Sequence, residues 1–393
     1  MKFFSPLVLL AAALFLFSSC IREEALNTEC DITGIDAAWL QEMQHEGFLI
    51  GNPEIDNWSV HFTIRKGADR TAIAPSFTLT EGASIYLDDG AGRVPGNGVV
   101  RDFSTPQTYT VVSEDGAWSK QYEVSFTYPQ PIGLCSFEHF GLNPEGQYNV
   151  FYEIDAADGS RQNYWDSGNA GYLFCGMAQA PADYPTVSEP AGYRGNGVRL
   201  VTRSTGSFGM RVGMPIAAGN LFIGEFAASQ AMLFPRKATA FGKQLVGGRP
   251  LYFSGWYKYT AGEVFTDGKN NVVPELHDTC DIYAVLYECD PKNFKALDGD
   301  DVLTSERIVS LARIDDPGEP QEWTYFREPF RPMNGKTFDE ARLRDNGYAI
   351  AIVATSSRQG AYFEGAVGSV LYVDELRIEW DETMDATETG GEE

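Results

Sequence analysis

The first third of the chain contains stretches in which apolar and polar residues alternate. In VHFTIR, residues 60–65, the apolar positions are Val60, Phe62 and Ile64. In KQYEVSFTY, residues 120–128, they are Tyr122, Val124, Phe126 and Tyr128. A period of two places alternate side chains on opposite faces of a half-buried antiparallel strand. Asp115-Gly116 stands between TYTVVS and the second stretch, and this dipeptide predicts a hairpin turn.

Residues 29–128 as a whole have the pattern of short strands separated by turns. Their length fits an immunoglobulin-like (Ig-like) β-sandwich, although the Cys–Trp–Cys core of antibody domains is lacking. The pattern breaks at YPQPIG, residues 128–133, which contains two prolines. We therefore place a linker at 129–133 and the start of a second domain at 134.

The second domain, residues 134–380, again consists of strands and turns. Its strongest strand patterns are RPLYFSGWYKYT, CDIYAVLYE, ERIVSLARI, GYAIAIVATSS and SVLYVDELRIEW. In GYAIAIVATSS both faces are apolar or small, which predicts a central strand of a sheet. Because these strands are too numerous for one flat sheet, we expect two packed sheets in a jelly roll. The predicted fold is all-β, an Ig-like sandwich followed by a larger β-jelly-roll domain.

Both ends of the chain differ from these domains. Residues 1–19 have a lysine followed by a short apolar run, too short to span a bilayer and typical of a signal peptide. Ser18-Ser19-Cys20 resembles a bacterial lipobox, which implies acylation of Cys20 and a membrane lipid anchor, with 20–28 as tether. Arg22-Glu23-Glu24 resembles the export tag of surface lipoproteins in Bacteroidetes, so we expect outer-membrane anchoring and surface exposure. The acidic residues 381–393 are predicted to form a disordered tail.

The composition argues against several classes of protein. The net charge of −25 argues against nucleic acid, whose phosphates would repel the chain, and against direct docking on anionic lipid heads. Four histidines and no CxxC pair make a zinc centre a poor fit. Cys280 and Cys289 lie far apart along one predicted strand and face opposite sides, which argues against a bridge between them. A bridge from Cys135 to Cys175 is left open.

A series of phrases in the second domain resembles a known family. They are NYWDSGNAGY, YPTV, GYRGNGVRLVTRST, AAGNLFIGEF, AFGKQLVGGRPLYFSGWYKYTAGE, CDIYAVLYE and ATSSRQGAYFEGAVGSVLYVDEL, in this order. Together they are similar to the putative carbohydrate metabolism domain family (PCMD) of Bacteroidetes lipoproteins. The resemblance covers most of 135–380. It implies a jelly-roll domain of the carbohydrate-binding-module kind behind an Ig-like spacer, and a role in glycan use. It implies no established catalytic residues.

Aromatic residues in loop-like contexts are the candidates for glycan contact. Sugars expose apolar C–H faces for ring stacking and hydroxyl groups for oriented hydrogen bonds. The candidate rings are Trp165, Tyr172, Trp323 and Tyr362. The alternative for each is that it fills the core, as aromatic rings of β-sandwiches usually do.

Two carboxylates are candidate ligands for a structural calcium ion. In SVLYVDELRIEW the apolar face is expected to be Val370, Tyr372, Asp374, Leu376, Ile378 and Trp380. A carboxylate on that face needs a partner, because burying an unpaired charge is costly. Glu138 opens the same domain in a similar setting, and first-strand and last-strand acids of jelly-roll modules often share Ca²⁺, which prefers oxygen ligands. The alternative is that Asp374 caps a turn or pairs with an arginine such as Arg199.

Local catalytic motifs are lacking. No GxSxG, Walker A or GxGxxG sequence occurs. Glycoside hydrolysis needs two acids about 5–9 Å apart. The adjacent pairs Asp88-Asp89, Asp300-Asp301 and Asp315-Asp316 lie in turn-like contexts where acids are normally solvated.

Three hypotheses follow. The first is a surface-anchored, non-catalytic lipoprotein that binds a polysaccharide or host glycan through its jelly roll. The second is a hydrolase or lyase that uses paired acids in a jelly-roll cleft. The third is an adhesin or structural protein of the cell surface that binds protein, with outer-membrane proteins as expected partners.

Overall fold

The computed structural model describes residues 26–46, 48–49, 52–64, 68–88, 90, 92–127, 132–154, 161–242, 244–246 and 248–381. The signal segment, the lipidation site at Cys20 and the tail beyond residue 381 lie outside these residues. No helix in the described part is both long enough and apolar enough to cross a membrane. The described residues form two compact units. One contains residues 26–43, Asn52–Phe62 and Asp69–Phe126, and the other consists mainly of the described residues from Thr127 onward.

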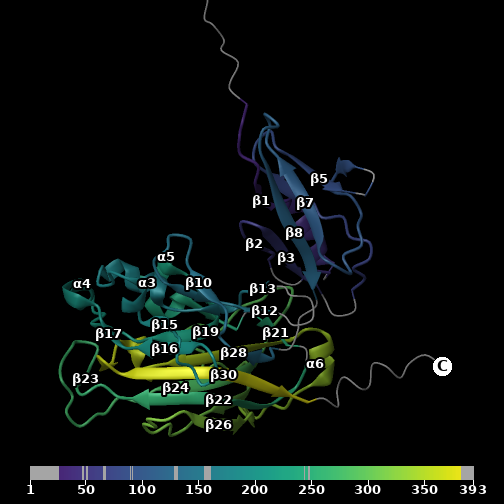
Figure 1. Cartoon of the computed structure of the whole chain (residues 1–393). Coiled ribbons are helices and arrows are strands. Elements are labelled where there is room, and N and C mark those ends of the chain that lie inside the picture. The colour runs from purple at the N-terminus through teal and green to yellow at the C-terminus, as the bar shows by residue number, and fades with distance from the viewer. Residues whose placement is uncertain are drawn as a thin grey trace, which may run out of the picture. The chain divides into compact units, whose positions relative to one another are not determined.

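The first unit is built from short antiparallel strands, coloured purple to blue in Figure 1. Its larger sheet has the order β2 (Glu54–Ile55), β3 (Ser59–Thr63), β8 (Ser119–Thr127), β7 (Gln107–Val112), β5 (Ser84–Asp88) and β6 (Arg93–Pro95). A second sheet pairs β1 (Ile32–Ile35) with β4 (Phe77–Leu79). The predicted inward positions from Val60 to Phe126 are buried, whereas Tyr128 lies outside the described residues. Strand β7 joins β8 through the predicted turn at Gly116.

A helix, α2 (Ala37–His45), interrupts the region that the sequence predicts as strands only. The segment AAWLQEMQH consists largely of strong helix formers. Asp36 precedes it and its Oδ1 accepts a hydrogen bond from the Trp39 N–H at 2.9 Å, as an N-cap does. Local helix propensity therefore prevails in this segment.

The second unit contains two large sheets. The first, the β22 sheet, has the order β15 (Thr186–Glu189), β16 (Gly197–Val201), β30 (Val370–Trp380), β22 (Pro250–Thr260) and β26 (Thr324–Pro329), and β9 (Leu134–Cys135) pairs with β30. The second, the β28 sheet, has the order β14 (Trp165–Asp166), β19 (Asn220–Phe226), β28 (Tyr348–Thr355), β24 (Asp281–Glu288), β25 (Ile308–Arg313) and β27 (Arg331–Pro332). Two short strands join this sheet, β20 (Thr239–Phe241) on β19 and β21 (Gln244–Leu245) on β28.

Shorter elements connect the strands of these sheets. Two-stranded pairs are β10 (Phe140–Leu142) with β11 (Asn149–Phe151), β12 (Glu153–Ile154) with β13 (Arg161–Gln162), β17 (Arg203–Ser204) with β18 (Ile216–Ala217), and β23 (Phe265–Thr266) with β29 (Gly365–Ala366). The α-helices are α3 (Asn169–Tyr172), α4 (Gly206–Arg211), α5 (Ala228–Ala231) and α6 (Glu340–Arg344). The 3₁₀ turns are η2 (Leu173–Cys175), η3 (Pro181–Asp183), η4 (Pro235–Ala238) and η5 (Gly360–Tyr362).

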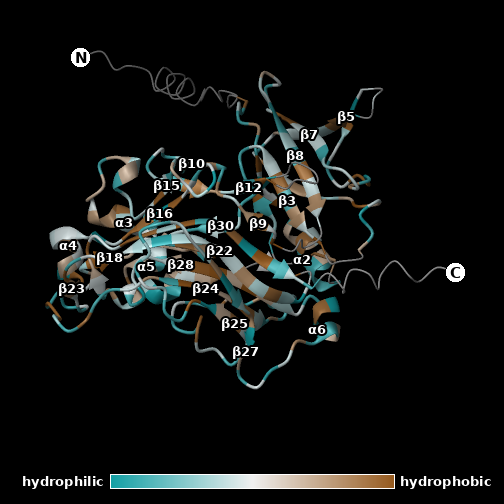
Figure 2. Cartoon of the chain, turned by 60° about the horizontal axis from the view of Figure 1, so that its bottom comes forward, coloured by the Kyte–Doolittle hydropathy of each residue, from teal (hydrophilic) through white to brown (hydrophobic). Residues whose placement is uncertain are grey.

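The main core of the second unit draws buried residues from both sheets, among them Phe253, Tyr257, Ile282, Ile350 and Leu371. Figure 2 shows hydrophobic residues along the strands of this unit. The prediction of a jelly-roll arrangement is confirmed, and β28 is a central strand as GYAIAIVATSS predicts. Both of its faces are buried because a second apolar cluster, which includes Phe222, Tyr283 and Val353, covers the outer side of the β28 sheet. The described cysteines are free thiols, so Cys135 and Cys175 are not bridged.

The last strand corrects one expectation. Ser254 of β22 pairs with Arg377 of β30, and Trp256 pairs with Asp374, so one residue of β22 faces two residues of β30. This is a β-bulge, and Glu375 within it has φ +51°. The bulge reverses the alternation: Leu371 and Val373 are in the core before it, and Leu376 and Ile378 after it. Tyr372 and Asp374 therefore lie on the side away from the core, contrary to the prediction.

Candidate functional site

The outward side of the β22 sheet carries a group of aromatic side chains. Every second side chain of β22 points into the core, so Trp256 and Lys258 project from the opposite face. The register of the sheet places Tyr325 of β26 opposite Trp256, and Tyr372 of β30 opposite Lys258. Residues distant in sequence thus meet on one surface.

The rings of this surface, which we call the aromatic face, are Tyr193, Trp256, Trp323, Tyr325 and Tyr372. Tyr193, in the loop between β15 and β16, stacks on Trp256 with ring centroids 3.7 Å apart and planes 10° apart. The centroid of Tyr325 lies 5.3 Å from that of Trp256, and Trp323 lies 6.4 Å from both Tyr193 and Tyr372. Each ring is therefore held in place by at least one other ring.

The aromatic face is open to solvent. Tyr325 is 50% exposed and Tyr193 is 39% exposed, while the other three rings are partly buried. The Lys258 Nζ lies 4.8 Å from the centroid of Trp323 and 4.6 Å from that of Tyr372, in cation–π contact with both. The face thus combines flat apolar area with a charged hydrogen-bond donor.

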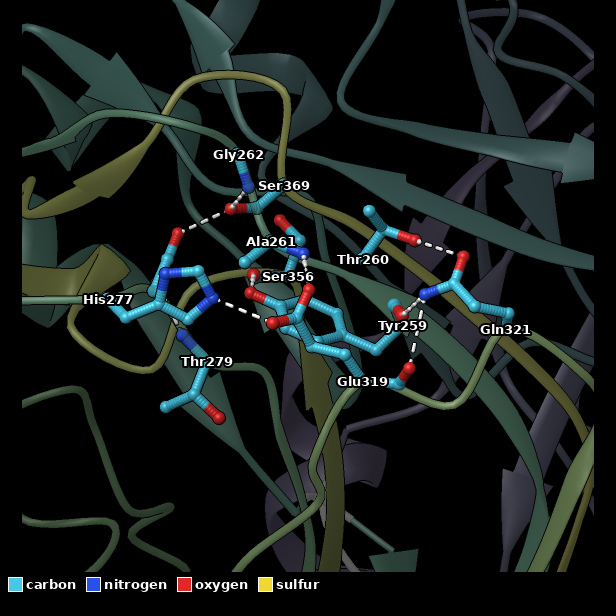
Figure 3. Close-up of polar contacts among 11 residues, drawn as sticks. Tyr259, Thr260, Ala261, Gly262, His277, Thr279, Glu319, Gln321, Ser356 and Ser369 are labelled. Carbon is cyan, nitrogen blue, oxygen red and sulfur yellow. Dashed lines mark hydrogen bonds and ion pairs between the residues drawn. The ribbon is translucent and has the colours of Figure 1, made fainter.

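The segment before Trp323 is fastened to the end of β22 (Figure 3). Glu319 Oε2 accepts a hydrogen bond from the Ala261 N–H at 2.8 Å, and its Oε1 lies 2.7 Å from His277 Nε2. These two hydrogen bonds hold the pKa of Glu319 below its usual range. Gln321 Nε2 donates to the Tyr259 carbonyl oxygen at 3.2 Å. Trp323 therefore follows a tightly held segment, which fixes where its ring can lie.

The two predicted metal ligands hold the loop that carries Tyr193. Asp374 Oδ2 accepts a hydrogen bond from the Arg194 N–H at 2.9 Å. Glu138 accepts from the backbone N–H of Asn196 at 3.1 Å and from its side-chain amide at 3.0 Å. The structure therefore brings Asp374 and Glu138 to the same loop, on either side of Gly195.

These contacts bear on the calcium prediction. Asp374 is fully buried, and burial raises the pKa of its carboxyl to about 6. Hydrogen bonds from the backbone N–H groups of Arg194 and Glu375 act in the opposite direction and lower this pKa. In the described ranges no group of three or more His, Cys, Asp or Glu side chains is arranged to hold a metal ion. The bonds of Asp374 match the alternative of a turn cap, and a shared calcium ion stays a prediction.

Comparison with known sequences identifies the second unit. The family model described as "Putative carbohydrate metabolism domain" matches residues 136–379. The chain belongs to this family. A second model, described as "SGBP, N-terminal", matches residues 48–126. The family resemblance expected from the sequence is therefore confirmed. No curated protein matches the chain.

Two solved structures resemble this family member. One is described as a "putative glycoside hydrolase" from Bacteroides thetaiotaomicron; it is 42% identical, with a TM-score of 0.70, and the match covers 92% of this chain and 99% of that one. The other carries the same description and comes from Bacteroides vulgatus; it is 38% identical, with a TM-score of 0.59, and the match covers 64% of this chain and 98% of that one.

The other ring candidates of the family domain lie elsewhere. Trp165 is 7% exposed and packs in the main core, where its tilted contact with Phe137 leaves it no open face for a sugar. Tyr172 is 6% exposed, and its hydroxyl donates to the Ser204 carbonyl oxygen at 2.9 Å. Tyr362 is 52% exposed. Tyr172 and Tyr362 line one cleft on the far side of the domain, and Trp323 lies on the aromatic face.

Sequence reasoning missed four of the five rings. Trp256 and Lys258 could have been found, because the alternation of RPLYFSGWYKYT places their side chains on the other face of the strand from Phe253 and Tyr257. Tyr372 could not, because the bulge that turns it outward depends on pairing between β22 and β30.

Proposed function

We propose that this protein captures a glycan on the aromatic face of its family domain and does not cleave it. The observation that carries the proposal is the gathering of five rings and Lys258 on one outward sheet face. Sugar rings offer flat C–H faces that stack on aromatic rings, and hydroxyl edges that need hydrogen-bond partners. The family description and the two Bacteroides relatives support a role with carbohydrate.

Polar groups at the border of the face suit the hydroxyl edges of a sugar. Arg199 lies opposite Tyr372 in the register, and its Nε has no hydrogen-bond partner, with Glu189 4.0 Å away. On the other side, Arg194 lies 3.6 Å from Glu375. Both cations make only loose ion pairs, so they can donate hydrogen bonds to a ligand.

Capture is favoured over hydrolysis because one acid in each of two candidate pairs is held in an ion pair with an arginine. Asp300 pairs with Arg236 at 2.9 Å, and Asp315 pairs with Arg331 at 3.3 Å. The description of the two relatives as putative glycoside hydrolases nevertheless favours a catalytic alternative, with a cleft carboxylate as acid. Release of reducing ends from a bound polysaccharide, measured with the purified full chain, would establish that alternative.

A glycan array followed by variants tests the capture proposal. We expect the purified full chain to bind one class among plant, microbial and mucin glycans. Tyr325→Ala, at a half-exposed position, is expected to weaken that binding about five- to tenfold, since an aromatic contact is worth about 1 kcal/mol. Tyr362→Ala is the matched control, because its ring is equally exposed but lies in the cleft.

Two results would contradict this proposal. If the protein binds no glycan on the array, the proposal of glycan capture is refuted. Equal losses in Tyr325→Ala and Tyr362→Ala would show that the aromatic face is not where the glycan binds.

We also propose that acylation of Cys20 anchors the protein at the outer membrane, where weak contacts gain from a high effective concentration. The "SGBP, N-terminal" match supports a surface role for the first unit. Cys20→Ser is expected to move the protein from the membrane fraction to the soluble fraction. An unchanged distribution would refute the lipid anchor.

A further inference from the structure

A cleft lies on the outer side of the β28 sheet, away from the aromatic face. Its volume is about 390 Å³. The walls come from the α3–η2 segment, α4, α5–η4, residues 299–304 and η5, which surround part of this side of the sheet. Cavities of this size are typical of small-molecule sites.

Three neighbouring strands form the floor of the cleft. One cross-strand row is apolar and consists of Phe222 of β19, Val353 of β28 and Tyr283 of β24. The next row is polar and consists of Asn220, Thr355 and Asp281 on the same three strands. The floor of the cleft therefore has an apolar row beside a polar row, and most of these side chains are nearly buried.

The walls are mainly hydrophobic. Apolar side chains that line the cleft include Phe174, Phe208, Val212, Met214, Phe226 and Met232. Phe174 is 48% exposed and Phe208 is 38% exposed. Large rings left this open beside a cavity indicate a binding surface for an apolar group.

The polar floor groups already have partners within the protein. The Asn220 Oδ1 accepts from the Gly168 N–H at 2.7 Å, and Thr355 Oγ1 donates to the Ser357 carbonyl oxygen at 3.3 Å. Arg313 donates two hydrogen bonds to the Asp281 carboxylate, from Nε at 2.8 Å and from Nη2 at 2.7 Å. A neutral sugar would leave most of its hydroxyls unpaired against these walls, which is costly.

Arg358 retains spare donor capacity. It lies 3.8 Å from Asp281, whose oxygens Arg313 already occupies. The Arg358 Nε is buried and has no hydrogen-bond partner, and the terminal nitrogens make three long bonds, 3.3–3.4 Å, to the carbonyl oxygens of Ile314 and Asp315. Arg236, in contrast, is paired with Asp300 at 2.9 Å. An anionic group in the cleft would meet its best partner at Arg358.

We propose that the cleft binds a small amphipathic carboxylate, with its apolar body between the Phe and Met side chains and its anionic group on Arg358. This site is separate from the aromatic face and does not depend on the proposed glycan capture.

Calorimetric titration of the purified full chain tests the proposal. The probes are straight-chain carboxylates from hexanoate to dodecanoate and the primary alcohols of equal length. We expect affinity to rise about fourfold for each added methylene until the cleft is full. Each carboxylate should bind roughly tenfold tighter than its alcohol, through the charge-assisted bond to Arg358.

Variants locate the site. Arg358→Gln should abolish the preference for acid over alcohol and leave the affinity for the alcohol unchanged. Arg327→Gln, on the β22 sheet and paired with Glu379, is the matched control and should retain the preference. Phe208→Ala, at a partly exposed rim position, should weaken both probes and serves as the second variant where Arg358→Gln does not fold.

The proposal fails if no probe binds, if carboxylates and alcohols bind equally, or if Phe208→Ala leaves both affinities unchanged. It also fails if a folded Arg358→Gln keeps the preference. Tyr325→Ala should not alter probe binding, so failure here is distinguishable from failure of glycan capture.

Discussion

Buried carboxylates are the residues on which the pH dependence of the second unit rests. Glu153 is 7% exposed and accepts hydrogen bonds from the N–H groups of Ser136 and Phe137 at 3.3 and 3.2 Å. Burial outweighs these bonds and raises the pKa of Glu153 to about 7, and the nearby Asp374 charge adds to the rise. Asp374 follows the same rule, with a pKa of about 6.

This arrangement predicts that the second unit is more stable in mild acid. The pKa of Glu153 is higher in the folded state than in the unfolded state, so the folded state binds more protons between the two values. The stability that protonation of Glu153 contributes is fully present below the pKa of the unfolded state, and it is lost as pH rises through about 7, the pKa of the folded state. From about pH 5.5 to about pH 8.5 we expect the free energy of unfolding to fall by about 2 kcal/mol.

Urea unfolding at the two pH values measures this change. Glu153→Gln should flatten most of the fall, because the amide does not titrate. A wild-type protein that is equally stable at both pH values would show that Glu153 does not carry this linkage.

Asp374 also decides the calcium prediction. If Asp374 and Glu138 share a calcium ion, a chelator lowers the melting temperature of the second unit, because a ligand bound to the folded state alone stabilises it. Asp374→Ala should then abolish the sensitivity to chelator. An unchanged melt in chelator would leave Asp374 as a turn cap, the role that its bond to the Arg194 N–H already describes.

Among the elements, the loop between β15 and β16 matters most for the aromatic face. It carries Tyr193, and its position depends on Gly195, whose φ is +67° and whose missing Cβ leaves room for Glu138 Oε1. A side chain at Gly195 would collide with that carboxylate and strain the backbone. The loop, the carboxylate and the ring are thus one positioning unit.

Gly195→Ala is therefore expected to displace the loop and break the stack of Tyr193 on Trp256. Near-ultraviolet circular dichroism should lose aromatic signal, and glycan affinity should fall about as far as in Tyr193→Ala. Gly335→Ala is the matched control, since its φ is +66° but nothing lies within 4 Å of its added Cβ. If the control perturbs the spectrum equally, backbone strain alone explains the effect.

At the scale of the whole domain, the two surfaces lie on opposite sides of the core. The aromatic face is on the outer side of the β22 sheet, and the cleft is on the outer side of the β28 sheet. No residue of the aromatic face lines the cleft. Sites without shared partners are expected to act independently.

We therefore expect glycan affinity to be the same, within about twofold, with and without saturating carboxylate. Titration of the glycan in both conditions measures the coupling. In the double variant Tyr325→Ala/Tyr362→Ala, the change in the free energy of glycan binding should equal the sum of the changes in the two single variants. A larger shift would reveal coupling through the core.

The pattern of the sequence was enough to predict the strands β3, β7, β8, β22, β24, β25, β28 and β30, the central place of β28, and the all-β class. These features depend on which residues lie two positions apart, and chain geometry alone sets that relation. The same local reasoning failed at β30, because its bulge arises from pairing with β22. One extra residue there moved Tyr372 and Asp374 to the other face.

The candidate site depended almost entirely on tertiary structure. Tyr193, Trp256, Trp323 and Tyr372 are spread over nearly half the chain, and only strand order and register bring them together. Trp165 was a candidate loop ring with core filling as the alternative, and long-range packing places it in the core. The sequence by itself determined the periodicity, and so the elements, whereas the fold decided which faces those elements present, because non-local pairing and burial are not written in neighbouring residues.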